Sequence, residues 1–298
     1  MDKVVTITTI ILLSSTVFFI VLERLFPYRK GLPFFREGFW VDLVWYTLIQ
    51  SYFLKIVIFN YIILPVDHKY NLSALHIVTD WPIWAQILLF LVTHDLYIYW
   101  FHRWQHSSKI LWRTHEAHHS NTAVDWIAGS RSHFVEILIN QTIEFLPIVV
   151  LGANPIIVPI KACIDAVWGM YIHSNINVRS GKLQYFINGP EMHLWHHADN
   201  RSVFFANYST KFAMWDWLFG TAYHPDMKPT KYGLYYDYPK DYFLQQINLV
   251  YKVDEHKLIQ KNKVFKAYYN TRPAFINYFK RIFARKTNQT PGDFRKAG

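Results

Sequence analysis

The chain has 298 residues, of which 52% are apolar, 18% aromatic and only 17% charged, a balance typical of a membrane protein. The net charge of +10 raises nucleic acid as a partner, but the basic residues flank long apolar stretches, which favours anionic lipid headgroups instead. A single cysteine, Cys163, excludes an internal disulfide, so the chain indicates nothing about an oxidising compartment.

Five apolar stretches follow one another along the first 172 residues. The first is long enough to span a bilayer and lacks a small-residue cleavage pattern after it, which predicts an anchor helix and not a removed signal peptide. The last two are short and are separated by a turn signal at residues 152–155, so a hairpin dipping into the bilayer competes with two full crossings. We expect an all-α, multi-pass bundle of about four to five helical segments: Val4–Leu22, Val41–Leu64, Trp81–Phe101, Phe134–Leu151 and Pro155–Ile172.

Positive charge predicts the orientation of these segments. Residues 23–40 and 102–133 are rich in Lys and Arg, whereas the connection 65–80 contains only Lys69. By the positive-inside bias, the two basic connections face the cytoplasm. An even number of crossings within 134–172 then returns the chain to the same side. We therefore expect an integral membrane protein in a bacterial inner membrane or the endoplasmic reticulum. Its histidine-rich segments, and any site that they form, would lie on the cytoplasmic face.

The composition along the chain predicts three parts. Residues 1–80 would form N-terminal transmembrane helices and 226–298 a basic cytoplasmic tail. Residues 81–225 contain most of the histidines, and the resemblance given below implies that they form the catalytic part. Within the tail, the stretch 257–286 resembles a basic helix with phenylalanines on one side. It would lie on lipid headgroups or pack as an ordinary solvated tail, and both readings stay open.

Three histidine clusters contain eight of the fifteen histidines. One has the spacing H-x3-H, and the other two have the spacing H-x2-H-H. On a helix, residues four apart share a face, whereas adjacent residues differ in direction by about 100°. The clusters therefore suit a pair of metal ions better than one. Imidazole suits Fe, Zn, Cu and Ni, and no set of thiolate ligands is available. The predicted ligands are His102, His106, His115, His118, His119, His193, His196 and His197.

Further polar residues near the clusters are candidates for supporting roles. Asp95 lies seven residues before His102 on the same predicted helix face, where it would accept a hydrogen bond from that ligand. Glu136, Asn140 and Glu144 recur every four residues, so they should face the bundle interior, because carboxylates facing lipid are costly. His173 ends the fifth apolar stretch and is a candidate ninth ligand.

Two other histidines are less informative. His133 is a possible further ligand, although a capping role fits it equally well, and His94 beside Asp95 is expected to be structural.

Two alternatives to a dimetal site remain open at this point. His115, Glu116 and His119 satisfy H-E-x-x-H, the zinc peptidase motif in which the glutamate is the general base. That reading leaves the other two clusters without a purpose. A metal transporter would instead place ligands along several spanning segments, whereas these histidines gather at one membrane face.

The order of the clusters resembles the fatty acid hydroxylase and sterol desaturase superfamily of membrane diiron oxygenases, over about residues 90–225. The resemblance makes His173 a further ligand. One departure is Phe134, where many members have proline. The matching residues are Asp95 with Tyr99–Arg103 and His106, His115–Ser120, Arg131 with His133 and Glu136, Ile172 and His173, Asn207 and Tyr208, and Trp215–Thr221.

The resemblance implies a centre of two non-haem iron ions that uses O2 and two electrons to oxidise an unactivated C–H bond. The product would be an alcohol or, after loss of a second hydrogen, an alkene. The implied substrate is a lipid of the sterol, fatty acyl, sphingolipid, alkylglycerol or carotenoid class. Electrons would come from a separate donor of the cytochrome b5 or ferredoxin type, because no flavin, haem or dinucleotide fingerprint is visible. The sequence predicts no oligomeric state.

Overall fold

The computed structural model describes residues 1–261 and 266–267, and within them it is helical and contains no β-strand. The all-α prediction is confirmed. The chain divides into two units, Met1–Leu249 and Val250–Gly298. The α-helices are α1 (Asp2–Leu25), α2 (Ser51–Val57), α3 (Leu64–Tyr70), α4 (Ile83–Ser107), α5 (Lys109–His119), α6 (Phe134–Val150), α7 (Ile157–His173), α8 (Pro190–His196), α9 (Met214–Leu218), α10 (Tyr242–Ile247) and α11 (Glu255–Lys261).

Three helical runs of the described chain are long and apolar enough to cross a membrane. They are α1, the continuous run Val41–Tyr70, and α4. The run Val41–Tyr70 joins α2 and α3 to two π-helical segments, η1 (Val41–Gln50) and η2 (Ile58–Ile63). On α1, apolar side chains such as Leu13 (62%) and Val17 (61%) are exposed, as expected of a helix that lipid surrounds. The chain is therefore a membrane protein.

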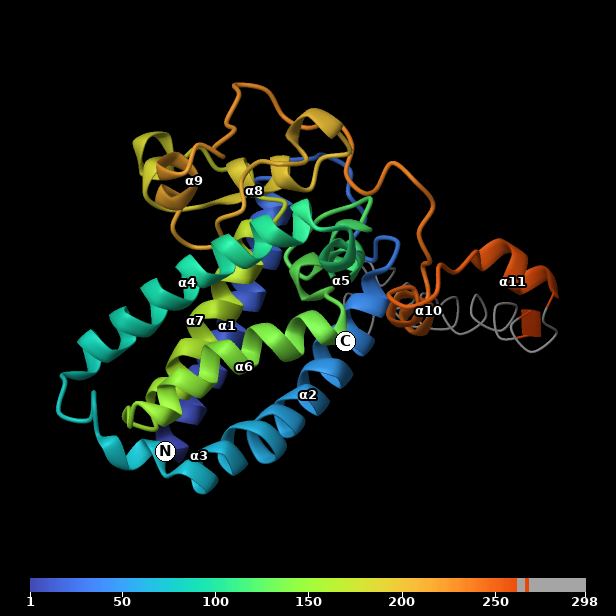
Figure 1. Ribbon diagram of the computed structural model, residues 1–298. Coiled ribbons are helices and arrows are strands. Elements are labelled where there is room, and N and C mark those ends of the chain that lie inside the picture. The colour runs from blue at the N-terminus through green and yellow to red at the C-terminus, as the bar shows by residue number, and fades with distance from the viewer. Residues whose placement is uncertain (262–265, 268–298) are drawn as a thin grey trace, which may run out of the picture. The chain divides into compact units, whose positions relative to one another are not determined.

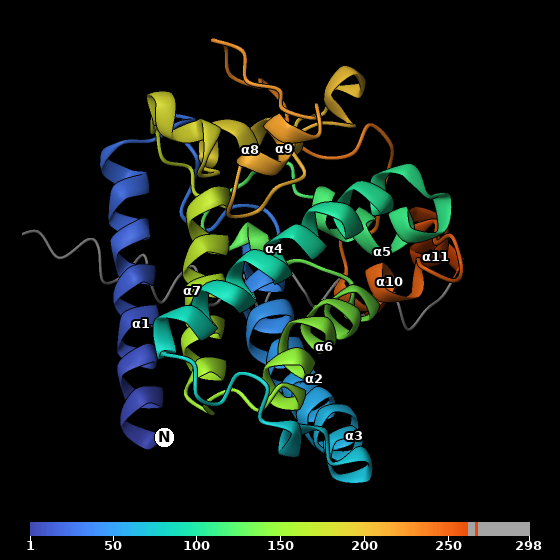
Figure 2. The ribbon, with the colours of Figure 1, turned by 60° about the vertical axis from the view of Figure 1, so that its left-hand side comes forward.

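Helices α6 and α7 are shorter, with 17 residues each. The turn predicted between them is present. In this turn Gly152 adopts a left-handed backbone with φ of 68°, a conformation that glycine adopts at no steric cost. For this pair, two full crossings and a hairpin that dips into the bilayer both stay predictions. In Figures 1 and 2, α7 lies beside α1, and α4 and α6 lie close to α7.

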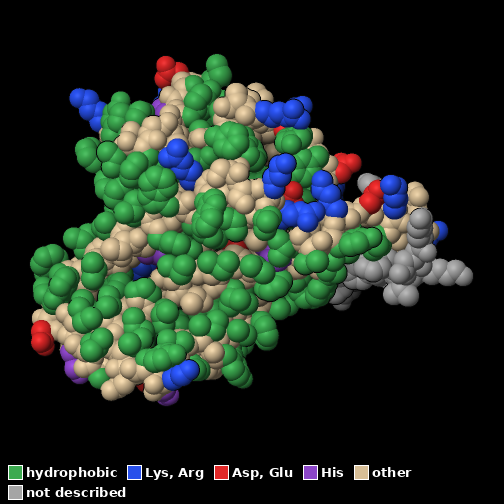
Figure 3. Space-filling model, in the orientation of Figure 1, with side chains coloured by type: hydrophobic (Ala, Val, Ile, Leu, Met, Phe, Trp, Pro, Cys, Tyr) green, Lys and Arg blue, Asp and Glu red, His purple; other side chains and the backbone are tan. Residues whose placement is uncertain are grey.

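The apolar core of the first unit lies among α4, α6, α7 and the run Val41–Tyr70. Buried Ile58, Phe90, Phe145 and Ile157 belong to it. At the other end of these helices, α5, α8 and α9 form a cap; α8 and α9 are seen at the top of Figures 1 and 2, and α5 lies lower and to their right. Figure 3 shows hydrophobic side chains over the lower helices and most Lys and Arg side chains on the upper part. The arrangement is the membrane bundle with a histidine-rich cap that the sequence predicts.

A buried charged network lies inside the bundle. The Lys161 ammonium on α7 donates to Glu144 Oε1 at 2.9 Å, to Asp165 Oδ2 at 2.5 Å and to His94 Nδ1 at 3.0 Å. The polar stripe of α6 therefore faces the interior as predicted, and Tyr97 donates to Asn140 at 3.1 Å. The structural role expected of His94 agrees with these contacts. Sequence reasoning missed Lys161 and Asp165.

Residues 226–249, which the sequence places in the tail, are part of the first unit. In that unit Tyr46 donates to Gln245 at 2.5 Å, and Tyr236 donates to Glu116 at 2.6 Å. Most of the stretch 257–286 lies outside the described residues, so its expected contact with lipid headgroups stays a prediction.

Candidate metal centre

Two short helices and the end of a long one place the three histidine clusters in the cap. His102 and His106 occupy the last two turns of α4. The chain then reverses at Ser108, whose side chain accepts from Leu111 N and caps α5. The second cluster ends α5. The third cluster ends α8, which begins at Pro190, a favourable first helical residue.

The structure brings all eight predicted ligands together with His173, and none of the nine side chains exposes more than 7% of its surface. Their ring nitrogens form two sets, and within each set the nitrogens lie within 4.8 Å of one another. Group 1 consists of His102, His106, His115, His119 and His196. Group 2 consists of His118, His173, His193 and His197.

Each H-x2-H-H string supplies both groups. Its first and last histidines, four residues apart, belong to one group, and its middle histidine belongs to the other. In α5 the middle residue is His118, whereas in and after α8 it is His196. This division follows from helical geometry, because adjacent side chains point in directions about 100° apart. The residues can therefore hold a pair of ions, as the spacing predicts.

The Nε2 atoms of the rings converge on one another. His102 and His115 bring their Nε2 atoms to 2.9 Å in group 1. In group 2 the corresponding distances are 2.9 Å for His173 and His193 and 3.1 Å for His193 and His197. Two nitrogens bound at right angles to one metal ion, each about 2.1 Å from it, lie roughly 3 Å apart. The spacing of the rings thus fits metal ligands.

The other ring nitrogen of several ligands is held by an acceptor. Because a carbonyl or carboxylate oxygen accepts, these Nδ1 atoms carry the proton and leave Nε2 free for a metal. His102 donates to Tyr208 O, His196 to Ala206 O, His118 to Arg131 O, His173 to Gly169 O, and His115 to Glu136 Oε1, at distances of 2.8 to 2.9 Å.

Burial keeps the imidazoles of α5 and α8 neutral. It lowers the pKa of His118 to about 4 and the pKa values of His115, His119, His193 and His196 well below their ordinary value. A neutral imidazole is the form that binds a metal. In group 1, His119 Nε2 and His196 Nε2 are buried without a hydrogen-bond partner. Such orphaned nitrogens are costly unless a cation satisfies them, so the residues fit a metal centre.

The predicted contact between Asp95 and His102 is wrong. His102 donates to Tyr208 O instead, and the Asp95 carboxylate accepts from Thr210, Lys211, Phe212 and Trp215 at 2.7 to 3.1 Å. Seven residues along a helix correspond to a rise of about 10 Å. Asp95 shares a face with His102 but is too far along α4 to reach it.

Two further sequence candidates lie outside the two groups. His133 caps α6, where Nδ1 accepts from Val135 N at 3.1 Å and Nε2 contacts Gln246 O at 2.8 Å. Glu116 turns away from the ligands, because its carboxylate accepts from Tyr236 and Asn248. This orientation argues against the zinc peptidase reading, which needs that carboxylate at the metal.

A buried ion-pair network that sequence reasoning missed supports group 2. Asp42 pairs with Arg131 Nε at 2.6 Å and with Arg36 at 2.7 Å, and Arg36 also pairs with Asp125 at 2.6 Å. The backbone carbonyl of the same Arg131 accepts from His118. The signal was available, because an acidic residue within an apolar stretch is rare unless it has a partner or a function.

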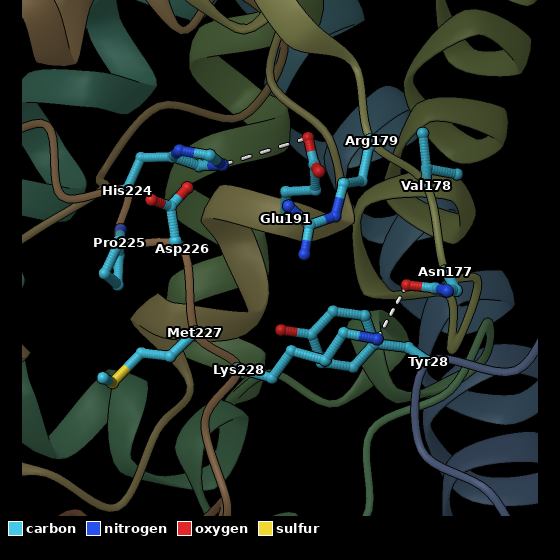
Figure 4. Close-up of a pocket in the computed structure, with 10 residues that line it drawn as sticks. All are labelled: Tyr28, Asn177, Val178, Arg179, Glu191, His224, Pro225, Asp226, Met227 and Lys228. Carbon is cyan, nitrogen blue, oxygen red and sulfur yellow. Dashed lines mark hydrogen bonds and ion pairs between the residues drawn. The ribbon is translucent and has the colours of Figure 1, made fainter.

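A surface pocket in the cap lies apart from the histidine groups. Among the residues that line it, Lys228 donates to Asn177 at 2.7 Å, and His224 lies 3.9 Å from Glu191 (Figure 4). None of the nine histidines lines this pocket. Its charged side chains are of both signs, and we assign no function to it.

Comparisons with known proteins match the part of the chain that contains the two histidine groups. The family model for fatty acid hydroxylase matches residues 87–221, which include both histidine groups. The ornithine lipid hydroxylase OlsE of Rhizobium tropici is 30% identical over 223 residues, which are 72% of this chain and 67% of the relative. Methylsterol monooxygenase 1 of Rattus norvegicus is 29% identical over 221 residues, covering 69% of this chain and 70% of the relative.

The alkylglycerol monooxygenase of Homo sapiens is 29% identical over 189 residues, which are 63% of this chain but only 39% of that protein. No solved structure matches the chain. The family model covers the two histidine groups, and one relative reaches 30% identity across two thirds of its own length. The chain therefore belongs to the fatty acid hydroxylase family and is an oxidoreductase.

Proposed function

We propose that the chain is a diiron oxygenase that hydroxylates or desaturates an unactivated C–H position of a membrane lipid. The observation that carries this proposal is the convergence of nine buried imidazoles into two adjacent groups. Two iron ions held by groups 1 and 2 would supply the redox chemistry that reduces O2 with two external electrons.

The residues of the chain would hold the ions, set the ring tautomers and exclude water. The neutral imidazoles of α5 and α8 need release no proton before they bind a metal. Glu136 Oε1 accepts from Nδ1 of the group 1 ligand His115 and so fixes the tautomer of that ring. Since all nine ligand side chains are buried, bulk water is kept from the reacting atoms.

A lipid is the substrate that the position of the site favours. His102 and His106 end a membrane helix, so a lipid can approach from the bilayer without leaving it. The named relatives act on ornithine lipids, methylsterols and alkylglycerols. We extend only their common feature, a membrane lipid, to this chain, with the site on the cytoplasmic face and electrons supplied by a cytochrome b5- or ferredoxin-type donor.

The test is comparative lipid analysis of cells with the chain, without it, and with the His118→Ala variant, grown under 18O2. A lipid that carries an 18O atom, or one additional double bond, only with the unaltered chain would support the proposal. Identical lipid profiles in all three cultures, despite membrane insertion and metal loading, would contradict it. Hydrolysis of a substrate without O2 would instead support the zinc hydrolase, and metal flux would support a transporter.

A further inference from the structure

The segment 206–209 between α8 and α9 presents two backbone carbonyls to group 1. Ala206 O accepts from His196 Nδ1 and Tyr208 O accepts from His102 Nδ1, both at 2.8 Å. We call residues 206–209 the carbonyl brace. Asn207, which lies between Ala206 and Tyr208, has a φ of 58°, a conformation that is uncommon outside glycine and turns the chain sharply between the two carbonyls.

Two side chains hold the brace in this conformation. Asn207 donates through Nδ2 to Met192 O and Tyr223 O at 2.8 Å, and its Oδ1 accepts from Tyr223 N at 2.7 Å. The Asp216 carboxylate, on α9, accepts from Tyr208 N at 2.8 Å and from Ser209 N at 2.9 Å. Both side chains are completely buried. The brace therefore has little freedom to move while these bonds are made.

Asp216 is further fixed by the segment that follows it. Thr221 Oγ1 donates to Asp216 Oδ1 at 2.7 Å, and Thr221 O accepts from Asn207 N at 2.9 Å. The string from Trp215 to Thr221, which metal chemistry alone leaves unexplained, is thus connected to two ligands of group 1. In the part of the chain that the structure describes, the rings of group 2 contact one another or other carbonyls, such as Arg131 O for His118 and Gly169 O for His173, and not the brace.

We propose that Asp216 and Asn207 are positioning residues that control metal binding at group 1 and not at group 2, by fixing the carbonyls that orient His102 and His196. This inference rests on the metal centre proposed above. Losing an outer partner of a metal ligand typically costs ten- to a hundredfold in affinity. The inference predicts that this loss falls on one of the two ions.

The experiment uses the full chain in detergent, stripped of metal and titrated with Co²⁺, with ions bound per chain and the cobalt absorption spectrum as readouts. In Asp216→Asn an amide N–H faces a backbone N–H, so one of the two brace bonds is lost. Asn207→Gly keeps the left-handed backbone but loses the side-chain bonds. Asp241→Asn is the matched control, because Asp241 is also buried and accepts from two backbone N–H groups, at the start of α10.

We expect the unaltered chain and Asp241→Asn to bind two ions tightly. Asp216→Asn and Asn207→Gly should each retain one tight ion, with affinity for the other lowered roughly ten- to a hundredfold. Combined with His193→Ala, which removes a group 2 ligand, either change should leave no tight ion. Combined with His119→Ala, which removes a group 1 ligand, either change should lower the metal affinity little further.

Equal weakening of both ions, or no weakening, in the variants that insert and retain helical content would overturn the inference. Asn207→Gly provides the second variant should Asp216→Asn fail to insert. The readout is independent of lipid oxidation. A chain that binds two ions with the predicted selectivity but oxidises no lipid would refute the proposed function and leave this inference standing.

Discussion

His118 and His119 are neighbours in the chain, yet their ring planes are inclined at 82° and their rings belong to different groups. His119 contributes to group 1 with His106, and His118 contributes to group 2 with His173. One turn of α5 therefore serves both proposed ions, and the two adjacent residues offer a test of the division.

His118→Ala and His119→Ala should each lower the bound metal from two ions to one and abolish turnover, while the protein still inserts into membrane. Each change removes a ligand, and neither residue lies in a candidate spanning helix. Metal content of the purified protein and lipid analysis provide the measurement. His106→Ala and His196→Ala should behave like His119→Ala. Substantial turnover by any of the four variants would contradict the proposed ligand set.

Glu136→Gln should lower metal affinity about ten- to a hundredfold, because His115 loses its carboxylate partner. Glu116→Gln is the matched control, since this second buried glutamate contacts Tyr236 and Asn248 and no ligand. The control should retain activity. Metal titration and product formation, measured for both variants, test this prediction. Loss of activity in Glu116→Gln with no effect in Glu136→Gln would favour the zinc peptidase reading.

Gly129→Ala should displace His173 and weaken binding at group 2. A Cβ atom at Gly129 would lie 2.5 Å from His173 Nδ1, a separation that requires the ring or the backbone to move. Gly169→Ala is the control on α7, because a Cβ there meets no atom within 4 Å, and alanine is the better helix former. We expect the ions bound per chain to fall only in Gly129→Ala; two tight ions in both variants would count against His173 as a ligand.

The metal-free protein should lose stability as the pH falls from about 6.5 toward 4. Burial lowers the pKa of His118 from 6.5 to about 4, so in this window the unfolded chain binds a proton that the folded chain does not. The free energy of unfolding then falls by at most about 1.4 kcal/mol per pH unit for each such histidine. Denaturation midpoints in detergent at several pH values measure this slope, which should be shallower in His118→Gln. An equally steep slope in both proteins would contradict the prediction.

Lys161→Met should destabilise the bundle by about 3–5 kcal/mol, because it leaves Glu144 without the ammonium that neutralises it inside the membrane part. Asp165 keeps an ion pair with Lys211 at 2.8 Å. Adding Glu144→Leu removes the unpaired carboxylate and should recover most of the loss. Unfolding in mixed detergent measures both variants. No recovery in the double variant would show that packing, and not charge, dominates at this position.

The features that were predictable from the sequence depend on local periodicity. Apolar length gave α1 and α4, and the 3.6-residue repeat predicted that His118 and His119 would point to different ions. The same repeat predicted that Glu144 and Asn140 face the bundle interior. Each of these inferences needs only the geometry of one helix, which the chain fixes over a few residues.

The features that were missed depend on distance between elements. Asp95 and His102 share a face of α4, but two residues on one face can still be too far apart along the helix axis to make contact. The Asp95 carboxylate instead binds the segment 210–215. Lys161 and Asp42 have partners on other helices or loops, which a single helical pattern cannot identify. The Asn207 conformation depends in the same way on contacts with Met192 and Tyr223.

The sharing of α5 and α8 between the two groups bears on how the centre assembles. The axial rotation of α5 aims His115 and His119 at one ion and His118 at the other, and the rotation of α8 aims His193 and His196 at different ions in the same way. A change that turned either helix about its axis would misalign both groups at once, whereas the loss of a single imidazole would leave the other group intact. The centre should therefore assemble only after both helices have docked.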